Sequence, residues 1–161
     1  MLFTGDTKRN GILRPRQKNA SPIETNFLFV YGLLMRGLER ADFLNNPDKA
    51  SFIGEAETAG VLYDVGSFPG MIASQNGGVV YGELYELHDP EIFFETLDLI
   101  EGYWPDQPER SLSIRKIISV ATTSGPINAW AYLLNLPSES LPQIPSGNFR
   151  AYQPVTGWLD E

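Results

Sequence analysis

The chain has 161 residues, which suits one domain of ordinary size. Hydrophobic residues make up 42% of the chain and charged residues 20%, so the chain can bury a core and lacks the composition of a disordered protein. The formal net charge of -8 argues against a nucleic-acid partner, because phosphate backbones bind clustered lysine and arginine side chains.

A basic segment precedes the predicted elements. Residues 1–26 hold five of the 12 basic residues and two of the 20 acidic ones, so their net charge is +3 and that of residues 27–161 is -11. The segment has almost no apolar periodicity, which predicts a flexible basic tail, and a tail that folds back on the acidic body is the alternative. We expect one domain over residues 27–161.

The first predicted strand covers residues 27–31. This run is aromatic and β-branched and stops at Gly32, as is typical of a strand buried on both faces. Residues 33–45 are predicted to form a helix. Residues 59–65 are a second predicted strand, and two glycines and a proline in residues 66–70 predict a turn after it.

The third predicted strand, residues 78–87, leads into a helix-start sequence. Asp89 suits the capping position and Pro90 the first helical position. The sequence therefore predicts a helix over residues 92–100, closed by Gly102 as its left-handed residue.

Two more strands are predicted over residues 112–122 and 126–134, joined by a hairpin turn at residues 124–125. Five strands with few helices, in no strict βαβ alternation, favour an α+β domain. We expect a mixed sheet that curls toward a small barrel.

Several kinds of chemistry are excluded by residue counts. The chain has no cysteine, which excludes disulfides, thiolate catalysis and cysteine-ligated metals. His88 is the single histidine, so Ser-His-Asp chemistry would have to run through it, and its predicted place in a strand-to-helix turn does not suit that role. No apolar run reaches the roughly 18 residues of a membrane span, and no signal peptide is evident. We expect a soluble, cytoplasmic protein without a membrane partner.

Asp98 and Glu101 are candidate proton-transfer groups, because their spacing of three puts both carboxylates on one helical face. Glu101 has apolar neighbours in the sequence and ends the predicted helix, where the helix dipole is negative. Both features raise the pKa of its carboxyl, as a general base at neutral pH requires. A solvated helix end is the alternative.

The predicted turn at Gly32 is a candidate anion site. A turn between a strand and a helix leaves free backbone N–H groups, which can hold a carboxylate or phosphate oxygen. Most such turns bind nothing, so the pattern alone is weak. Gly82 alone is equally weak evidence of a site. We interpret it as a strand glycine that relieves crowding or lets a ligand approach.

Seven segments, taken together and in order, resemble the gamma-glutamylcyclotransferase-like family over residues 29–150. The resemblance implies a small mixed β-barrel with flanking helices, a pocket at its mouth, and neither a metal nor an organic cofactor. The segments are Val30-Tyr31-Gly32-Leu33-Leu34 with Gly37, Gly66-Ser67-Phe68-Pro69-Gly70, Gly82-Glu83-Leu84-Tyr85, Leu97-Asp98-Leu99-Ile100-Glu101-Gly102, Ile114-Arg115, Ala129-Trp130-Ala131-Tyr132 and Ile144-Pro145-Ser146-Gly147-Asn148-Phe149-Arg150.

The resemblance also implies a site. The family's substrate is held by main-chain amides of the segment that matches residues 31–34, and the glutamate that matches Glu101 is the catalytic acid/base. The sequence departs from the family at Leu33, where threonine or serine is usual, and at Ser113, where an aromatic residue is usual. The substrate-binding residues that the resemblance implies are Tyr31, Gly32, Leu33, Leu34, Gly70, Arg115 and Tyr132.

The activity implied is the release of 5-oxoproline from a gamma-glutamyl amino acid, peptide or amine. The α-amine of the substrate attacks its own γ-carbonyl, so the reaction needs no enzyme nucleophile and one carboxylate can move the protons. The alternative, which Leu33 and Ser113 favour, is a non-catalytic module that binds small metabolites on the same fold. The sequence leaves the leaving group and the oligomeric state open.

Overall fold

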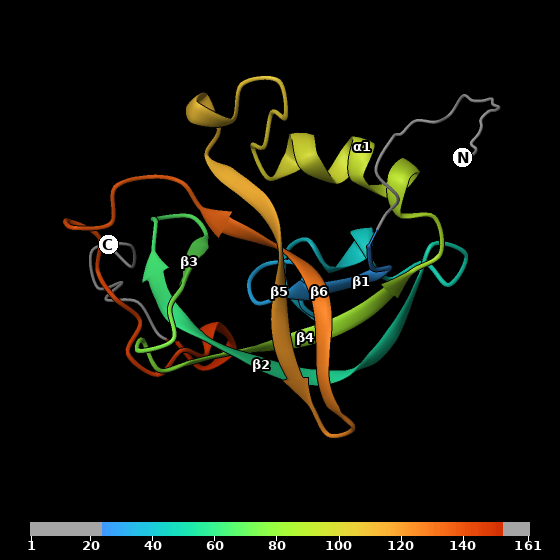
Figure 1. The fold of residues 1–161 in the computed structure, drawn as a ribbon, viewed down its shortest axis with the longest axis horizontal. Coiled ribbons are helices and arrows are strands. Elements are labelled where there is room, and N and C mark those ends of the chain that lie inside the picture. Colours follow the sequence, from blue (N-terminus) through green and yellow to red (C-terminus); the bar gives the residue numbers. More distant parts are fainter. Residues whose placement is uncertain (1–23, 153–161) are drawn as a thin grey trace, which may run out of the picture.

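Six strands make up the sheet of this protein, whose computed structural model describes residues 24–152. The strand order is β3-β2-β4-β1-β6-β5, and a further pairing of β2 with β5 closes all strands except β3 into a barrel (Figure 1). Because β1 runs parallel to β6 while the other pairs are antiparallel, the barrel is mixed, as expected. The strands are β1 (Phe27–Val30), β2 (Ala50–Asp64), β3 (Pro69–Ala73), β4 (Val79–Leu87), β5 (Ser113–Thr122) and β6 (Gly125–Leu134).

One α-helix, α1 (Pro90–Ile100), lies outside the barrel (Figure 1). Its signals are those predicted: the Asp89 carboxylate accepts a hydrogen bond from the Ile92 N–H at 3.4 Å, and Gly102 follows the helix with a φ of 72°. Three short 3-10 helices, η1 (Ala41–Phe43), η2 (Pro108–Arg110) and η3 (Phe149–Ala151), complete the described elements. No helix within residues 24–152 is long and apolar enough to cross a membrane.

The sheet separates two hydrophobic cores. Phe29 and Tyr31 point into the barrel, where side chains from every strand meet. Leu28 and Val30 point to the outer face, which α1 and residues 34–44 cover. β1 is therefore buried on both faces, as its apolar run predicted.

Residues 33–45 do not form the predicted helix, and that prediction was wrong. The Met35 N–H donates to the Gly32 carbonyl at 3.0 Å and the Arg40 N–H to the Leu33 carbonyl at 2.8 Å, so the segment runs through successive turns. Gly37 lies between them with a φ of 80°, a conformation that favours glycine. Only η1 is helical within this segment.

The second strand is longer than predicted, and the turn after it is shorter. β2 begins at Ala50 rather than Ala59, with a register shift between Phe52 and Gly54 that interrupts the alternation of side chains. β3 begins at Pro69, inside the predicted turn. Because β3 pairs only with β2, it is an edge strand, where a proline without an N–H is tolerated.

Most of the predicted N-terminal segment, residues 1–26, lies outside the described residues. The structure begins to describe the chain just before β1. There the Thr25 carbonyl accepts a hydrogen bond from the Trp130 indole at 3.1 Å, and the Thr25 hydroxyl donates to the Asn128 carbonyl at 2.8 Å.

Candidate functional site

A cavity of about 40 Å³ lies where β1 ends, between the following turn, the start of β3 and the end of α1. It brings together every predicted site residue except Gly70 and Arg115. The lining residues are Phe29, Val30, Tyr31, Gly32, Leu33, Leu34, Arg40, Phe68, Pro69, Glu101 and Tyr132.

The turn at Gly32 presents backbone donors to this cavity. The N–H groups of Gly32, Leu33 and Leu34 have no hydrogen-bond acceptor within residues 24–152. A Cβ atom at residue 32 would lie 2.7 Å from Pro69 Cγ, so only glycine lets β3 approach the turn this closely. Such a row of unpaired amides suits a carboxylate.

Glu101 faces the same cavity from the end of α1. Its main chain continues the helix, with its N–H donating to the Leu97 carbonyl at 2.9 Å, and Gly102 then turns the chain away. Burial raises the pKa of the Glu101 carboxyl, and the positive charge of Arg40 partly opposes that rise. Within the described part of the chain, the carboxylate accepts no hydrogen bond. Its position and its raised pKa both suit a base.

Asp98 ties the C-terminal end of α1 to the barrel. Its carboxylate accepts two hydrogen bonds from Arg115, at 2.9 and 3.2 Å, and one from the Tyr132 hydroxyl at 2.6 Å. The Arg115 guanidinium lies 3.9 Å from the centre of the Phe94 ring and 4.6 Å from that of Trp130. Arg115 thus packs behind the cavity, where it holds Asp98.

The two cavity tyrosines use their hydroxyls within the protein. Tyr31 donates to the Tyr132 carbonyl and accepts from the Met71 N–H at 3.2 Å. Burial, followed by the charge of Glu101, raises the pKa of Tyr31. Burial and then the hydrogen bond to Asp98 raise the pKa of Tyr132. Both side chains therefore shape the wall of the cavity and stay neutral.

Gly70 also packs beside the cavity. A Cβ atom there would lie 2.9 Å from Leu134 Cδ1 and 3.2 Å from Val65 Cγ2, so the glycine permits close packing of β3. Gly82 has a similar role on β4, where a Cβ atom would collide with the Val30 carbonyl oxygen.

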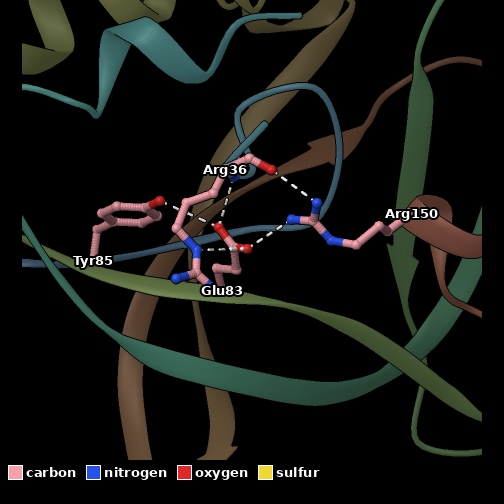
Figure 2. A network of polar contacts seen from close by, with 4 residues as sticks. All are labelled: Arg36, Glu83, Tyr85 and Arg150. Atoms are coloured by element: carbon pink, nitrogen blue, oxygen red, sulfur yellow. Dashed lines mark hydrogen bonds and ion pairs between the residues drawn. The ribbon is translucent and has the colours of Figure 1, made fainter. Parts of the chain in front are cut away.

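A buried carboxylate, Glu83, fixes the turn that follows β1 (Figure 2). Glu83 is 3% exposed. Its Oε1 accepts from the Arg36 main-chain N–H at 3.0 Å and from the Tyr85 hydroxyl at 3.2 Å. Its Oε2 accepts from Arg150 at 2.7 Å and from Arg36 Nε at 3.4 Å. Burial and the Glu83 charge raise the pKa of Tyr85 to about 12.

Arg150 is the second residue that anchors this turn. Its second guanidinium nitrogen donates to the Arg36 carbonyl at 2.8 Å, so both the N–H and the C=O of Arg36 are bound (Figure 2). The turn that carries the unpaired amides is thus anchored to β4 and to the C-terminal segment.

His88 lies away from the cavity, at the opposite end of α1. Its Nε2 lies 2.7 Å from Ser51 Oγ, and its Nδ1 lies 3.1 Å from the Asp48 carbonyl oxygen. The His88 ring therefore contacts the start of β2 and the loop that precedes this strand. Within residues 24–152, no group of three or more His, Asp or Glu side chains is placed to bind a metal ion.

Five lining residues were not among the predicted site residues: Phe29, Val30, Arg40, Phe68 and Pro69. Phe29 and Val30 were assigned to a strand, Arg40 to a helix that does not form, and Phe68 and Pro69 to a turn. Only its spatial meeting with Glu101 identifies Arg40, because no local pattern connects the two residues.

Comparison with known proteins agrees with this architecture. The family model described as "Gamma-glutamyl cyclotransferase, AIG2-like" matches residues 28–151. A curated relative, "Putative gamma-glutamylcyclotransferase BH1612" of Halalkalibacterium halodurans, is 45% identical over 49 residues, which are 30% of this chain and 42% of that protein.

Solved structures share the fold. YkqA from Bacillus subtilis has a TM-score of 0.60 and 25% identity, over 78% of this chain and 40% of that chain. An aig2-like protein from Mus musculus has a TM-score of 0.60 and 24% identity, over 75% of this chain and 86% of that one. The matched region is thus less than half of BH1612 and of YkqA. Since the family model spans most of the barrel and both sides of the cavity, the chain belongs to the gamma-glutamyl cyclotransferase, AIG2-like family.

Proposed function

We propose that this protein releases 5-oxoproline from a gamma-glutamyl amino acid, peptide or amine. The observation that supports the proposal is the meeting, in one cavity, of the Glu101 carboxyl with the unpaired amides of residues 32–34. The amides suit the substrate's α-carboxylate, and Glu101 has the raised pKa that a base for an α-ammonium needs.

The reaction joins two groups of one molecule. With the α-carboxylate on the amides, the α-nitrogen faces Glu101, and its attack on the γ-carbonyl carbon forms the ring C–N bond as the amide C–N bond breaks. One of the three α-ammonium protons stays on the ring nitrogen. The other two pass in turn through Glu101 to the leaving nitrogen, which departs as an ammonium. Orientation of such paired groups supplies roughly 7–11 kcal/mol of a barrier.

The proposal needs only groups of the chain and the substrate. Tyr31 and Tyr132 form the walls, and Asp98 with Arg115 holds the helix end that carries Glu101. The proposed reaction therefore requires no metal or organic cofactor. We also propose a cytoplasmic location and a small-molecule substrate, as expected from the sequence.

The test is to incubate the purified protein with gamma-glutamyl dipeptides and amines and to measure 5-oxoproline by mass spectrometry. Glu101→Gln keeps the shape of the side chain but removes the base, so kcat should fall by at least about 100-fold while ligand affinity is retained. Glu95→Gln, at an exposed position of the same helix, is the control and should keep the wild-type rate. Equal rates for both variants would contradict the role of Glu101.

A binding module is the second candidate, favoured by Ser113. This residue is 8% exposed and lies two positions from Arg115 on the same face of β5, opposite Leu134, whose side chain contacts Gly70 beside the cavity. Binding of gamma-glutamyl compounds without 5-oxoproline release would support the module. Ser113→Tyr should then restore turnover if the missing aromatic ring is the cause.

A further inference from the structure

Arg40 lines the cavity together with Glu101 and the amides of the turn. The arginines around it are all paired: Arg36 and Arg150 with Glu83, and Arg115 with Asp98. Arg40 differs from them, because within residues 24–152 no carboxylate lies within ion-pair distance of its guanidinium. Its charge nevertheless acts on the Glu101 carboxyl. A cation that the described residues leave without an ion pair therefore faces the place where the reaction is proposed.

The Arg40 main chain lies on the side of the Leu33–Leu34 peptide that is opposite the Leu34 N–H. The Arg40 N–H donates to the Leu33 carbonyl at 2.8 Å. In a trans peptide the C=O and N–H point in opposite directions, so the Leu34 N–H of the same peptide points away from the Arg40 main chain. Arg40 and the residues of the unpaired amides all line the cavity, so the cavity offers two separate kinds of anion partner, backbone N–H groups and a guanidinium.

A gamma-glutamyl amine has one carboxylate, which the amides would hold. A gamma-glutamyl amino acid has a second one, on the carbon next to the leaving nitrogen. We propose that Arg40 binds this second carboxylate, so that the protein selects gamma-glutamyl amino acids over gamma-glutamyl amines. The inference rests on the proposed function and names the leaving group that this cavity prefers.

Two substrates that differ in one group provide the test. Gamma-glutamylalanine and gamma-glutamylethylamide are identical except for the carboxylate of the leaving group. We expect the wild type to prefer the dipeptide in kcat/KM by at least about tenfold, as a charge-assisted pair allows. Arg40→Gln should bring the ratio of the two values close to one, and Arg40→Lys should retain part of the preference.

The ratio isolates recognition from other effects of the substitution. Arg40 also lowers the Glu101 pKa, but its loss changes the base for both substrates alike and cancels in the ratio. Arg110→Gln removes an exposed arginine outside the cavity and should keep the wild-type ratio. Thermal denaturation of each variant checks that it is folded.

The outcomes distinguish this inference from the proposed function. Equal rates for both substrates in the wild type, or an unchanged ratio in Arg40→Gln, would overturn the role of Arg40 and leave 5-oxoproline release intact. If neither substrate reacts, calorimetric affinities are compared instead. A dipeptide preference that depends on Arg40 would then support the carboxylate site while contradicting turnover, and no binding of either compound would contradict both.

Discussion

Glu101 is a carboxyl whose charge the fold disfavours. Burial raises its pKa above the ordinary value of 4.5, so the folded state holds the proton more tightly than the unfolded state. The stability from the protonated form is fully present below the ordinary pKa, and it is lost as the pH rises through the raised pKa. Charged Glu101 therefore destabilises the protein at neutral pH.

This predicts a pH-dependent effect of Glu101→Gln on the melting temperature. At about pH 7 the variant should melt higher than the wild type, and below about pH 4 the gain should disappear, because both side chains are then neutral. Differential scanning calorimetry at the two pH values is the measurement. A gain of the same size at both would mean that titration of Glu101 is not its cause.

Gly32 is the position at which a single methyl group should damage the site. In Gly32→Ala the Cβ atom would lie 2.7 Å from Pro69 Cγ and push the amide turn away from β3. We expect affinity for a gamma-glutamyl ligand to fall at least about tenfold, as measured by calorimetry, because the donors lose their common direction. Leu33→Thr leaves the backbone in place and should bind as well as the wild type or better. Equal losses in both variants would argue against recognition by the main chain.

At the scale of elements, Glu83 is the link between β4 and the turn that carries the unpaired amides. Glu83→Gln keeps the size of the side chain but leaves Arg36 and Arg150 without a charged partner. We expect the free energy of unfolding to fall by about 1–3 kcal/mol, less than for a fully buried pair because both arginines are partly exposed. Since the turn positions the amides, KM should rise more than kcat falls.

The control for Glu83 is a glutamate on the neighbouring strand. Glu55 is the register partner of Glu83 on β2, and its side chain is exposed. Glu55→Gln removes the same charge without removing a buried hydrogen-bond acceptor. Urea unfolding and steady-state kinetics of both variants should therefore separate anchoring from a general effect of charge.

Elements with local signals were predictable from the sequence. α1 has a capping Asp89, Pro90 at its first position and Gly102 after its end, and each signal acts within a few residues. Residues 33–45 have helix-compatible side chains, but their conformation follows from Gly37 and from Glu83, which lies 47 residues from Arg36. Contacts at that distance leave no periodicity in the sequence.

The same distinction applies to the site. Glu101 could be predicted as a candidate site residue from its place at a helix end and from its match to the family's motif. Arg40 could not, because its relation to Glu101 exists only once the turns of residues 33–45 place both beside the cavity. The roles of Asp98 and Arg115 likewise depend on a pairing across 17 residues, between a helix and a strand.

At the scale of the whole molecule, the segment after β6 crosses the barrel at Gly147. The Ile144 N–H donates to the Leu62 carbonyl at 2.8 Å, and the Tyr81 N–H donates to the Gly147 carbonyl at 2.9 Å. Gly147 has a φ of 69°, and a Cβ atom there would collide with the Val79 carbonyl oxygen. This contact leaves no room for a side chain.

We therefore predict that Gly147→Ala lowers the free energy of unfolding by at least about 2 kcal/mol, as measured by urea denaturation. Gly125 is the matched control: its φ is 112°, but no atom lies within 4 Å of the position that a Cβ atom would take there. Gly125→Ala thus tests backbone strain alone and should cost less. A larger loss at residue 125 would show that strain, rather than the contact with β4, governs both positions.

Because of Arg150, the organisation of the candidate site depends on a residue that is synthesised late. The residue that holds the Arg36 carbonyl lies 114 positions further along the chain, after every strand of the barrel. A growing chain that has not yet released residue 150 already contains every strand of the barrel, but its amide turn still lacks one of two anchors. The last anchor of the candidate site is therefore also among the last parts of the described chain to be synthesised.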